Sequence, residues 1–390
     1  MPHTGIIETF FFIFAGAAVL ATVSLYTRQP MLVAYVVLGM ALGPFGAGWV
    51  SDAALLSEIA EFGIIFLLFL VGLDLQPSKL KNMLGESLLT ALGTTIVFFA
   101  IGFSVLYSFG YTWIEACVAG IAASFSSTIL GIKLLPTTAL HHRHIGEMVI
   151  SLLLIQDLLA ILAILMLNGL GSESDGLLAS LGAMFIGLPV IGIGAVLGVR
   201  YVLLPLLAKF DAFHEYIFLV AIGWCLGLAV AANSFGLSLE IGAFIAGISL
   251  ATSPIAMYIA ESLRELRDFF LVLFFFSVGA GLNIQLLDQV WLAAALFALI
   301  LIAMKPLIFA TLLKLQREPR SVAWEVGFRL GQASEFSLLL SFIALSNQLI
   351  GEQAGLVIQF GTVLTLVLSS YFVIFRYPSP IAPDPKLRRD

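Results

Sequence analysis

The chain has 390 residues, of which 61% are hydrophobic and only 11% are charged, and its formal net charge is −6. A soluble domain carries about 25% charged residues, so this composition excludes an ordinary soluble protein and indicates an integral membrane protein. No basic stripe suggests nucleic acid as a partner. The two cysteines, Cys117 and Cys225, lie in apolar segments and imply neither a disulfide framework nor a metal site.

The first apolar segment is expected to be a retained membrane span. Residues 1–28 lack the basic n-region and clear cleavage site of a signal peptide, and their apolar run is long enough to cross a bilayer. Segments of about 20 mostly apolar residues follow along the chain and predict an all-α polytopic membrane protein. We expect thirteen transmembrane helices, at 6–26, 31–49, 54–73, 85–108, 113–133, 145–167, 177–199, 214–233, 237–253, 265–282, 289–312, 322–345 and 351–375.

Lys and Arg residues indicate which ends of the spans face the cytoplasm, because they concentrate in cytoplasmic loops. With the N-terminus outside and the C-terminus in the cytoplasm, 16 of the 18 basic residues fall in inside segments. The other two, Lys305 and Arg329, fall inside predicted spans, where an ionisable residue is costly and indicates function. We expect a multi-pass protein of the cell membrane, namely a bacterial inner membrane.

Two segments repeat at a constant offset of 207 residues. EFGIIFLLFLVG (61–72) resembles DFFLVLFFFSVG (268–279), and a chance similarity between Phe-rich spans is the alternative. These spans are the third and the tenth, so the copies run in opposite directions, as in inverted-repeat secondary transporters. We predict an exchanger domain over 1–378, made of a first repeat (1–170), a linker span (175–211) and an inverted second repeat (212–378), with a short cytoplasmic tail at 379–390.

Two spans carry the signals of a helix that is broken near the middle of the membrane, where such folds bind their substrate. The fifth span contains AASFSSTILG (122–131), and the twelfth contains RLGQASEFS (329–337). Both are rich in small and hydroxyl residues, and Ser and Thr can satisfy the backbone groups that a break exposes. Ordinary packing of small residues between helices is the alternative.

The sixth span places Gln156 and Asp157 at the centre of the apolar stretch SLLLIQDLLAIL (151–162). A charged Asp at a helix centre costs roughly 2.5–3.5 kcal/mol on insertion, and Asn or Ser would fill a structural role more cheaply. A carboxylate that holds either a proton or a cation is the minimum device for exchange. Hard cations prefer oxygen ligands, so the candidate cation and proton site comprises Asp157, Gln156, Ser126, Ser127 and Thr128.

The roles of the other polar residues are less tightly fixed by the sequence. Gln156 and Asp157 lie about 100° apart around a helix, so Gln156 either orients the site or makes an interhelical hydrogen bond. Arg329 and Glu335 are six positions apart, and a break at Gly331 could bring them together. We expect Arg329 to be structural and Glu335 to be a second carboxylate or an organiser of the helix crossing.

Several motifs follow one another in order along nearly the whole chain. They are AYVVLGMALGP (34–44), EFGIIFLLFLVGLDLQP (61–77), SFSST (124–128), QDLLAI (156–161), GAFIAG (242–247), Lys305 and GQASEF (331–336). Together they resemble the membrane domain of the monovalent cation:proton antiporter-2 family, and the Gln-Asp pair is similar to the ion site of its Kef-type potassium/proton antiporters. The chain departs from that pattern at Glu147, where Arg is frequent, and at Asn283, where an acid is usual.

This resemblance implies a homodimeric antiporter that exchanges a monovalent cation for protons by alternating access. It favours K⁺ over Na⁺, and one ion-site acid implies one proton per cation and electroneutral exchange. It also implies that Lys305 approaches Asp157 in one state, the alternative being a fixed buried pair, and that Lys305, Glu335 and Arg329 compensate charge. The expected partners are the lipid bilayer, monovalent cations and protons, without a cofactor or any metal beyond the transported cation.

Full-length Kef proteins carry a cytosolic nucleotide-binding regulatory domain after the membrane domain. Only about 14 polar residues follow the last span here, so we expect no ligand gating through such a domain in this chain. A separate cytosolic regulatory subunit is a candidate partner. GIGAVLG (192–198) is a poor match to a dinucleotide motif, because it lies inside a span with no strand before it.

Two other functions stay open, a sodium-coupled symporter of an organic solute on the same fold and a passive potassium pathway or orphan subunit. An enzyme is not expected, because no nucleophile–base constellation is visible. His141, His142 and His144 form a cluster with Arg143 that is either a solvated loop or a metal site.

Overall fold

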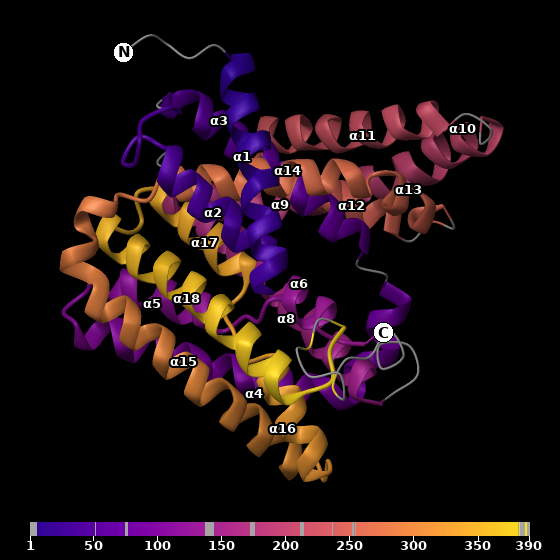
Figure 1. Ribbon diagram of the computed structural model, residues 1–390. Coiled ribbons are helices and arrows are strands. Elements are labelled where there is room, and N and C mark those ends of the chain that lie inside the picture. The colour runs from indigo at the N-terminus through magenta and orange to yellow at the C-terminus, as the bar shows by residue number, and fades with distance from the viewer. Residues whose placement is uncertain are drawn as a thin grey trace. The chain divides into compact units, whose positions relative to one another are not determined.

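The computed structural model describes residues 6–50, 52–74, 77–136, 144–171, 176–210, 214–235, 237–251, 253, 255–380, 382 and 387. In these ranges the chain is all-helical, as the sequence predicts, and no β-strand occurs in them (Figure 1). The chain divides into two compact units. Unit 1 comprises Met1–Ser51, Asn82–Ile164 and Val278–Asp390, and unit 2 comprises Asp52–Lys81 and Leu165–Ser277.

Unit 1 contains the segments that were predicted to hold the site. Its helices are α1 (Ile6–Thr27), α2 (Met31–Leu42), most of α4 (Pro77–Ser108), α5 (Trp113–Ala123), α6 (Thr128–Lys133), most of α8 (His144–Gly171), the 3-10 turn η2 (Ile284–Leu286), α15 (Leu287–Leu315), α16 (Arg320–Arg329), α17 (Glu335–Ser346) and α18 (Glu352–Arg376). In Figure 1, α15 and α18 run side by side, and α5 and α17 are also in contact.

Unit 2 is built mainly on the packing of α12 against α3. Its helices are α3 (Ala53–Asp74), α9 (Gly176–Gly198), the π-helical turn η1 (Val199–Leu203), α10 (Leu204–Lys209), α11 (His214–Ser234), α12 (Leu239–Ala251), α13 (Ala256–Ser262) and most of α14 (Arg264–Ala280). Gly247 allows α12 to approach α3 closely, since a Cβ there would overlap the α3 backbone at Phe69. The GAFIAG and FLVG motifs therefore meet across a helix crossing.

Helices occur in all thirteen predicted span regions. Among the described residues, eight of these helices are long and apolar enough to cross a membrane, judged by length and composition. The predicted second and ninth spans are the shorter apolar helices α2 and α12, and the predicted twelfth is divided between α16 and α17. The count of thirteen thus stays a prediction, as does the orientation. The seventh span extends to Lys209 rather than 199, because the helix continues through the π-turn that precedes Pro205, which has no backbone N–H.

The two compact units do not follow the predicted repeats. Each unit combines segments from both halves of the chain, whereas the predicted repeats are consecutive halves joined by a linker. A division of the chain by spatial contacts does not test whether two halves of the sequence repeat, so the inverted repeat stays a prediction. The predicted linker and tail lie partly outside the described residues, and so does most of the histidine cluster.

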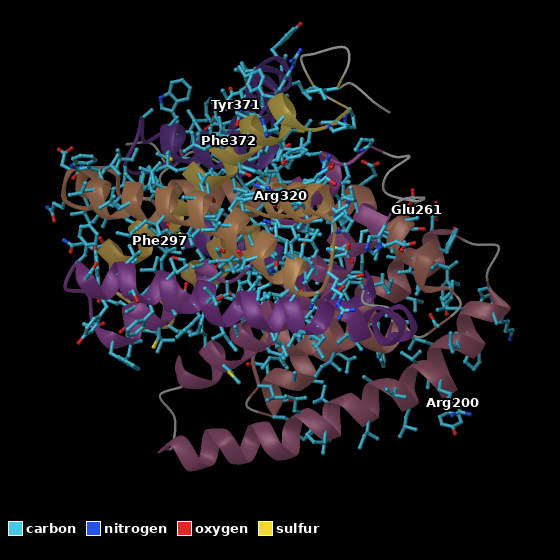
Figure 2. All side chains as sticks on the ribbon, turned by 90° about the horizontal axis from the view of Figure 1, so that it is seen from below. Arg200, Glu261, Phe297, Arg320, Tyr371 and Phe372 are labelled. Atoms are coloured by element: carbon cyan, nitrogen blue, oxygen red, sulfur yellow. The ribbon has the colours of Figure 1, made fainter. Side chains whose placement is uncertain are left out.

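The core of unit 1 lies between α4, α8, α15 and α16. Phe98 and Phe309 meet edge to face with ring centroids 5.3 Å apart, and Leu152, Val149 and Val326 are fully buried beside them. Figure 2 labels Phe297 on α15, which is buried, and Phe372 on α18, which is half exposed. An apolar helix that buries one face and exposes apolar residues on another is suited to a lipid environment. This core supports the helix that carries Asp157.

Candidate functional site

The predicted fifth span is interrupted between α5 and α6, at residues 124–127, which we call break one. Ser124 ends α5, and the hydroxyl of Ser127 caps α6 by accepting the Leu130 N–H at 3.1 Å. The Ser126 hydroxyl donates to the carbonyl of Leu330 at 2.8 Å. Ser side chains therefore replace backbone hydrogen bonds that the interruption removes, as the SFSST motif predicts.

The predicted twelfth span is interrupted between α16 and α17, at residues 330–334, which we call break two. Ser334 caps α17 by accepting the Phe336 N–H at 3.1 Å, and the Ser337 hydroxyl accepts the Ser334 N–H at 3.2 Å. Ser337 also donates to the carbonyl of Ala122, at the end of α5, at 2.6 Å. Since Ser126 donates to Leu330, hydrogen bonds run in both directions between the α5–α6 segment and the α16–α17 segment. The broken-helix interpretation is thus confirmed in the geometry of both segments.

Asp157 on α8 faces the start of α6. The Thr128 hydroxyl lies 3.0 Å from both Asp157 carboxylate oxygens, and the residue is only 7% exposed. Thr128 is the first residue of α6, so this carboxylate lies near the N-terminal end of a half-helix, where negative charge is favoured. The structure thus brings Asp157 together with Thr128.

Gln156 also reaches break one, but it contacts the backbone. Its Oε1 accepts the Ser126 N–H at 3.1 Å, and the side chain is fully buried. Its Nε2 is buried without a hydrogen-bond partner among the described residues. The carboxamide oxygen therefore satisfies a backbone N–H in the interrupted segment. This contact favours the interhelical hydrogen bond, one of the two roles that the sequence allowed.

Lys305 joins both breaks. Its ammonium donates to the carbonyls of Phe125 at 2.6 Å, Gln332 at 2.9 Å and Ala123 at 3.2 Å, and it lies 4.9 Å from the centre of the Phe98 ring. The side chain is completely buried. In this structure Lys305 therefore contacts carbonyls at the C-terminal end of α5 and at break two, rather than forming the fixed pair with Asp157 that the sequence allowed.

Glu335 and Arg329 are not brought together by break two, which corrects one expectation. Glu335 Oε1 accepts the Ile129 N–H at 3.3 Å, at the start of α6. Arg329 pairs instead with Glu325 at 2.8 Å and donates to the Leu134 carbonyl at 2.8 Å, at the end of α6. The i, i+4 spacing of Glu325 and Arg329 on α16 explains the pairing, whereas Glu335 begins α17 after break two and contacts α6.

The charges of these residues match the ends of the half-helices. A helix carries partial positive charge at its N-terminus and partial negative charge at its C-terminus. The acidic Glu335 lies at the start of α6 and the basic Arg329 at its end, while the basic Lys305 lies at the end of α5. Together they can stabilise two interrupted helices in a setting that has few other polar partners.

Sequence reasoning missed the part that α18 plays. Gln332 Oε1 accepts the Ser369 hydroxyl at 3.0 Å, and its Nε2 donates to the Arg329 carbonyl at 2.9 Å. The Thr365 hydroxyl accepts the Ala333 N–H at 2.9 Å. Thr365 and Ser369 are four residues apart, which places them on one face of α18. That spacing of hydroxyl residues in the last span was the available signal.

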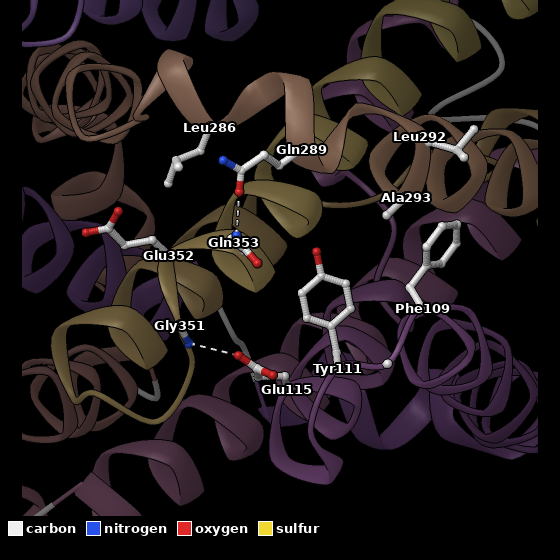
Figure 3. Close-up of a pocket in the computed structure, with 11 residues that line it drawn as sticks. Phe109, Tyr111, Glu115, Leu286, Gln289, Leu292, Ala293, Gly351, Glu352 and Gln353 are labelled. Carbon is white, nitrogen blue, oxygen red and sulfur yellow. Dashed lines mark hydrogen bonds between the residues drawn. The ribbon is translucent and has the colours of Figure 1, made fainter.

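A pocket lies away from the breaks, at the N-terminal end of α5. It has a volume of about 650 Å³ and is lined by residues that include Phe109, Tyr111, Glu115, Gln289 and Gln353 (Figure 3). Glu115 accepts the Gly351 N–H at 3.1 Å, and Gln353 donates to Gln289 at 2.8 Å. Burial, and after it the nearby Glu115, raises the pKa of Tyr111. The pocket lies at the N-terminal end of α5, about 16 Å along the helix from break one.

A metal site from the histidine cluster is not supported by the part of the chain that is described. His144 is exposed, and its Nε2 lies 2.9 Å from Glu318 Oε1. Within the described residues there is no group of three or more His, Cys, Asp and Glu residues arranged to hold a metal ion. His141 and His142 lie outside those residues.

Comparisons with known proteins identify the fold and the family. The structure is similar to that of the sodium proton antiporter MjNhaP1 from Methanocaldococcus jannaschii at pH 8, with 17% identity, a TM-score of 0.65, and coverage of 94% of this chain and 95% of that one. The structure is also similar to a 3D EM map of the same antiporter, with 16% sequence identity and a TM-score of 0.62. This match covers 95% of this chain and 96% of that one. These likenesses show an all-helical membrane fold of the antiporter type.

A family model described as "Sodium/hydrogen exchanger, transmembrane" matches residues 9–376, which is nearly the whole chain. The matched region includes both breaks, Asp157 and Lys305. This family consists of transporters rather than enzymes, and it exchanges cations for protons. The chain therefore belongs to the sodium/hydrogen exchanger family of transmembrane proteins.

Proposed function

We propose that this exchanger carries one monovalent cation against one proton at a single site centred on Asp157. The observation that supports the proposal is the position of this carboxylate. It is nearly buried, it accepts the Thr128 hydroxyl, and it faces the point where a half-helix begins. A proton and a cation would compete for the same carboxylate, and exchange follows if both loaded states can change their access to the two sides.

The neutral ligands of the cation would come from break one. The Thr128 hydroxyl contacts the carboxylate, whereas the hydroxyls of Ser126 and Ser127 contact Leu330 and Leu130. A hydroxyl oxygen that donates or accepts one hydrogen bond still has a lone pair for a hard cation. We therefore keep Ser126 and Ser127 as ligands that also hold the break, and assign to Gln156 the interhelical hydrogen bond to the Ser126 N–H.

The charge-compensating residues act on the helix ends rather than on the ion. Lys305, Glu335 and Arg329 contact the ends of α5 and α6, so the interrupted helices stay stable when Asp157 exchanges its charge partner. In another state of the transport cycle Lys305 would approach Asp157, as the Kef-type resemblance implies. The Lys305 ammonium would then neutralise the carboxylate when neither a proton nor a cation is bound to it.

We further propose that K⁺ is the preferred cation, that exchange is electroneutral and that the protein works as a homodimer. The support for K⁺ is the similarity of Gln156-Asp157 to the Kef-type pair. Purified protein in proteoliposomes should show the largest proton movement with K⁺ when K⁺, Na⁺, Li⁺ and Rb⁺ are compared. An imposed voltage should leave the rate unchanged. Preference for Na⁺ or a voltage-driven rate would contradict the respective part of the proposal, and transport that cannot oppose a gradient would indicate a passive pathway.

A further inference from the structure

The last helix, α18, contacts break two through two hydroxyl side chains. Thr365 accepts the Ala333 N–H at 2.9 Å and donates to the Thr362 carbonyl at 2.7 Å. Ser369, one turn further on, donates to Gln332 Oε1 at 3.0 Å. Thr365 and Ser369 are 0% and 3% exposed, so neither hydroxyl can exchange its protein partner for bulk water. The hydroxyl face of α18 is thus fixed to two consecutive residues of break two.

Ser369 and the Arg329 carbonyl together determine which way the Gln332 carboxamide points. A hydroxyl donor requires an acceptor, so the carboxamide oxygen faces Ser369 and the NH₂ group faces the opposite way. There the NH₂ group donates to the Arg329 carbonyl at 2.9 Å and makes a long contact with the Ser127 carbonyl at 3.5 Å. The reverse orientation would place the carboxamide oxygen against the Arg329 carbonyl oxygen, so that two acceptors would face each other.

Gln332 in turn connects break two to the candidate ion site. The Ser127 carbonyl belongs to the peptide group that precedes Thr128, and the Thr128 hydroxyl contacts both oxygens of Asp157. The backbone carbonyl of Gln332 also accepts from Lys305 at 2.9 Å. A change in the Gln332 side chain would therefore alter the position of Ser127, which is one of the proposed ion ligands and directly precedes Thr128.

We propose that Ser369 and Gln332 are positioning residues that hold the ion site of the exchanger in its cation-binding geometry. Neither is assigned contact with the ion. Ser369, together with the Arg329 carbonyl, fixes the orientation of the Gln332 carboxamide, and Gln332 fixes the separation of the two breaks. The inference rests on the proposed function, since it concerns the affinity of the site at Asp157.

The test is the cation concentration that gives half-maximal exchange in proteoliposomes, measured with K⁺ and with Na⁺. Ser369→Ala leaves Gln332 Oε1 buried without its donor, and we expect about a tenfold increase in that concentration with a smaller change in the maximal rate. Ser369→Thr keeps the hydroxyl and should restore the wild-type value. Ser369→Ala combined with Gln332→Ala should be no worse than Gln332→Ala alone, because the two residues act as one unit.

Ser370→Ala is the matched control. Ser370 is also buried on α18, but its hydroxyl contacts Gln29 at 3.3 Å and the Val367 carbonyl at 2.8 Å rather than break two. Its half-maximal concentration should stay at the wild-type value. Should Ser369→Ala not fold, Thr365→Val keeps the side-chain volume while it removes the second contact with break two, and it should raise the same concentration.

Three results would overturn the inference. The first is an unchanged half-maximal concentration in Ser369→Ala, even if its thermal stability falls. The second is an equal increase in Ser370→Ala, and the third is failure of both Ser369→Ala and Thr365→Val to fold, which would make the contacts structural only. Asp157→Asn separates the two proposals. If Asp157→Asn retains exchange, the proposed function fails. If Asp157→Asn loses exchange but Ser369→Ala keeps the wild-type half-maximal concentration, only the present inference fails.

Discussion

Lys305 shows at the residue scale why this position favours a cation with several donors. Its three contacts are with the carbonyls of Ala123 at the end of α5, Phe125 in break one and Gln332 in break two. An ammonium group has three N–H donors on one atom, and no neutral side chain provides that number at a single point. One buried lysine can therefore replace three missing backbone donors and offset the negative end of α5.

Lys305→Met should lower the thermal stability of the detergent-solubilised protein. The variant keeps the side-chain length but leaves three buried carbonyls without this donor, and each unsatisfied group costs about 1–3 kcal/mol. The measurement is the unfolding midpoint by fluorescence, with Lys314→Met as the control, since Lys314 is an exposed lysine on the same helix. Equal midpoints for the two variants would show that Lys305 does not support the breaks.

The sequence was sufficient to predict which residues are unusual, but not which atoms they contact. Asp157 is recognisable in the sequence because a carboxylate in an apolar helix raises the free energy of membrane insertion, and SFSST contains the hydroxyl residues that accompany it. Whether Glu335 meets Arg329 could not be predicted, because the direction of the chain after Gly331 is set by tertiary contacts, whereas the pair of Arg329 with Glu325 follows their i, i+4 spacing. Residues 180 positions apart, such as Phe125 and Lys305, meet only once the fold is known.

At the scale of the elements, the close packing of α15 against α16 places Lys305 beside the two breaks. A Cβ at Gly327 on α16 would lie only 2.6 Å from the carbonyl oxygen of Pro306, the residue that follows Lys305. Pro306 has no backbone N–H, which weakens the regular hydrogen bonding of α15 at this position. The absence of a side chain at Gly327 therefore sets how far α15 can advance toward α16.

Gly327→Ala should reduce exchange by displacing α15. The added methyl group meets backbone rather than a flexible side chain, so the helices must separate, with a typical cost of about 1–3 kcal/mol. Gly223→Ala is the control, because a Cβ at Gly223 on α11 meets nothing within 4 Å. Exchange rates and unfolding midpoints of both variants provide the comparison. A Gly327→Ala protein with wild-type rate and midpoint would show that the approach is not required.

The interrupted helices themselves could be predicted, because local composition determines them. Hydroxyl residues that cap half-helices are recognisable in SFSST and in GQASEF. The support from α18 was not predicted, since buried Ser and Thr in a membrane helix commonly bond within their own helix. Only the tertiary structure distinguishes Ser369, which reaches Gln332, from hydroxyls that remain local.

At the scale of the whole molecule, charge and hydropathy determine the membrane class, while the spatial division of the chain depends on long-range packing. Unit 1 gathers three separate stretches and unit 2 two, so neither follows consecutive halves. In the part of the chain that the structure describes, α2, α12 and α17 are apolar helices that are shorter than a membrane span. The number of crossings therefore requires an experiment on the membrane-embedded protein.

A labelling experiment tests the predicted topology. Residues 108 and 320 are separated by seven predicted spans, so they should lie on opposite sides of the membrane. In a background with Cys117 and Cys225 replaced by Ala, Ser108→Cys should react with an impermeant maleimide from outside. Arg320→Cys should react only after the membrane is permeabilised. Reaction of both from the same side would contradict the odd number of crossings.

The central claim is that a proton and a monovalent cation compete for the Asp157 carboxylate. The most direct measurement is cation-driven proton movement by Asp157→Asn in proteoliposomes, compared with wild type at equal protein content and with folding verified by size-exclusion chromatography. Asn keeps the shape and a hydrogen-bonding oxygen but can neither carry the charge nor bind the exchanged proton. We predict that exchange falls to the level of protein-free liposomes. A folded Asp157→Asn protein that exchanges at the wild-type rate would contradict the account.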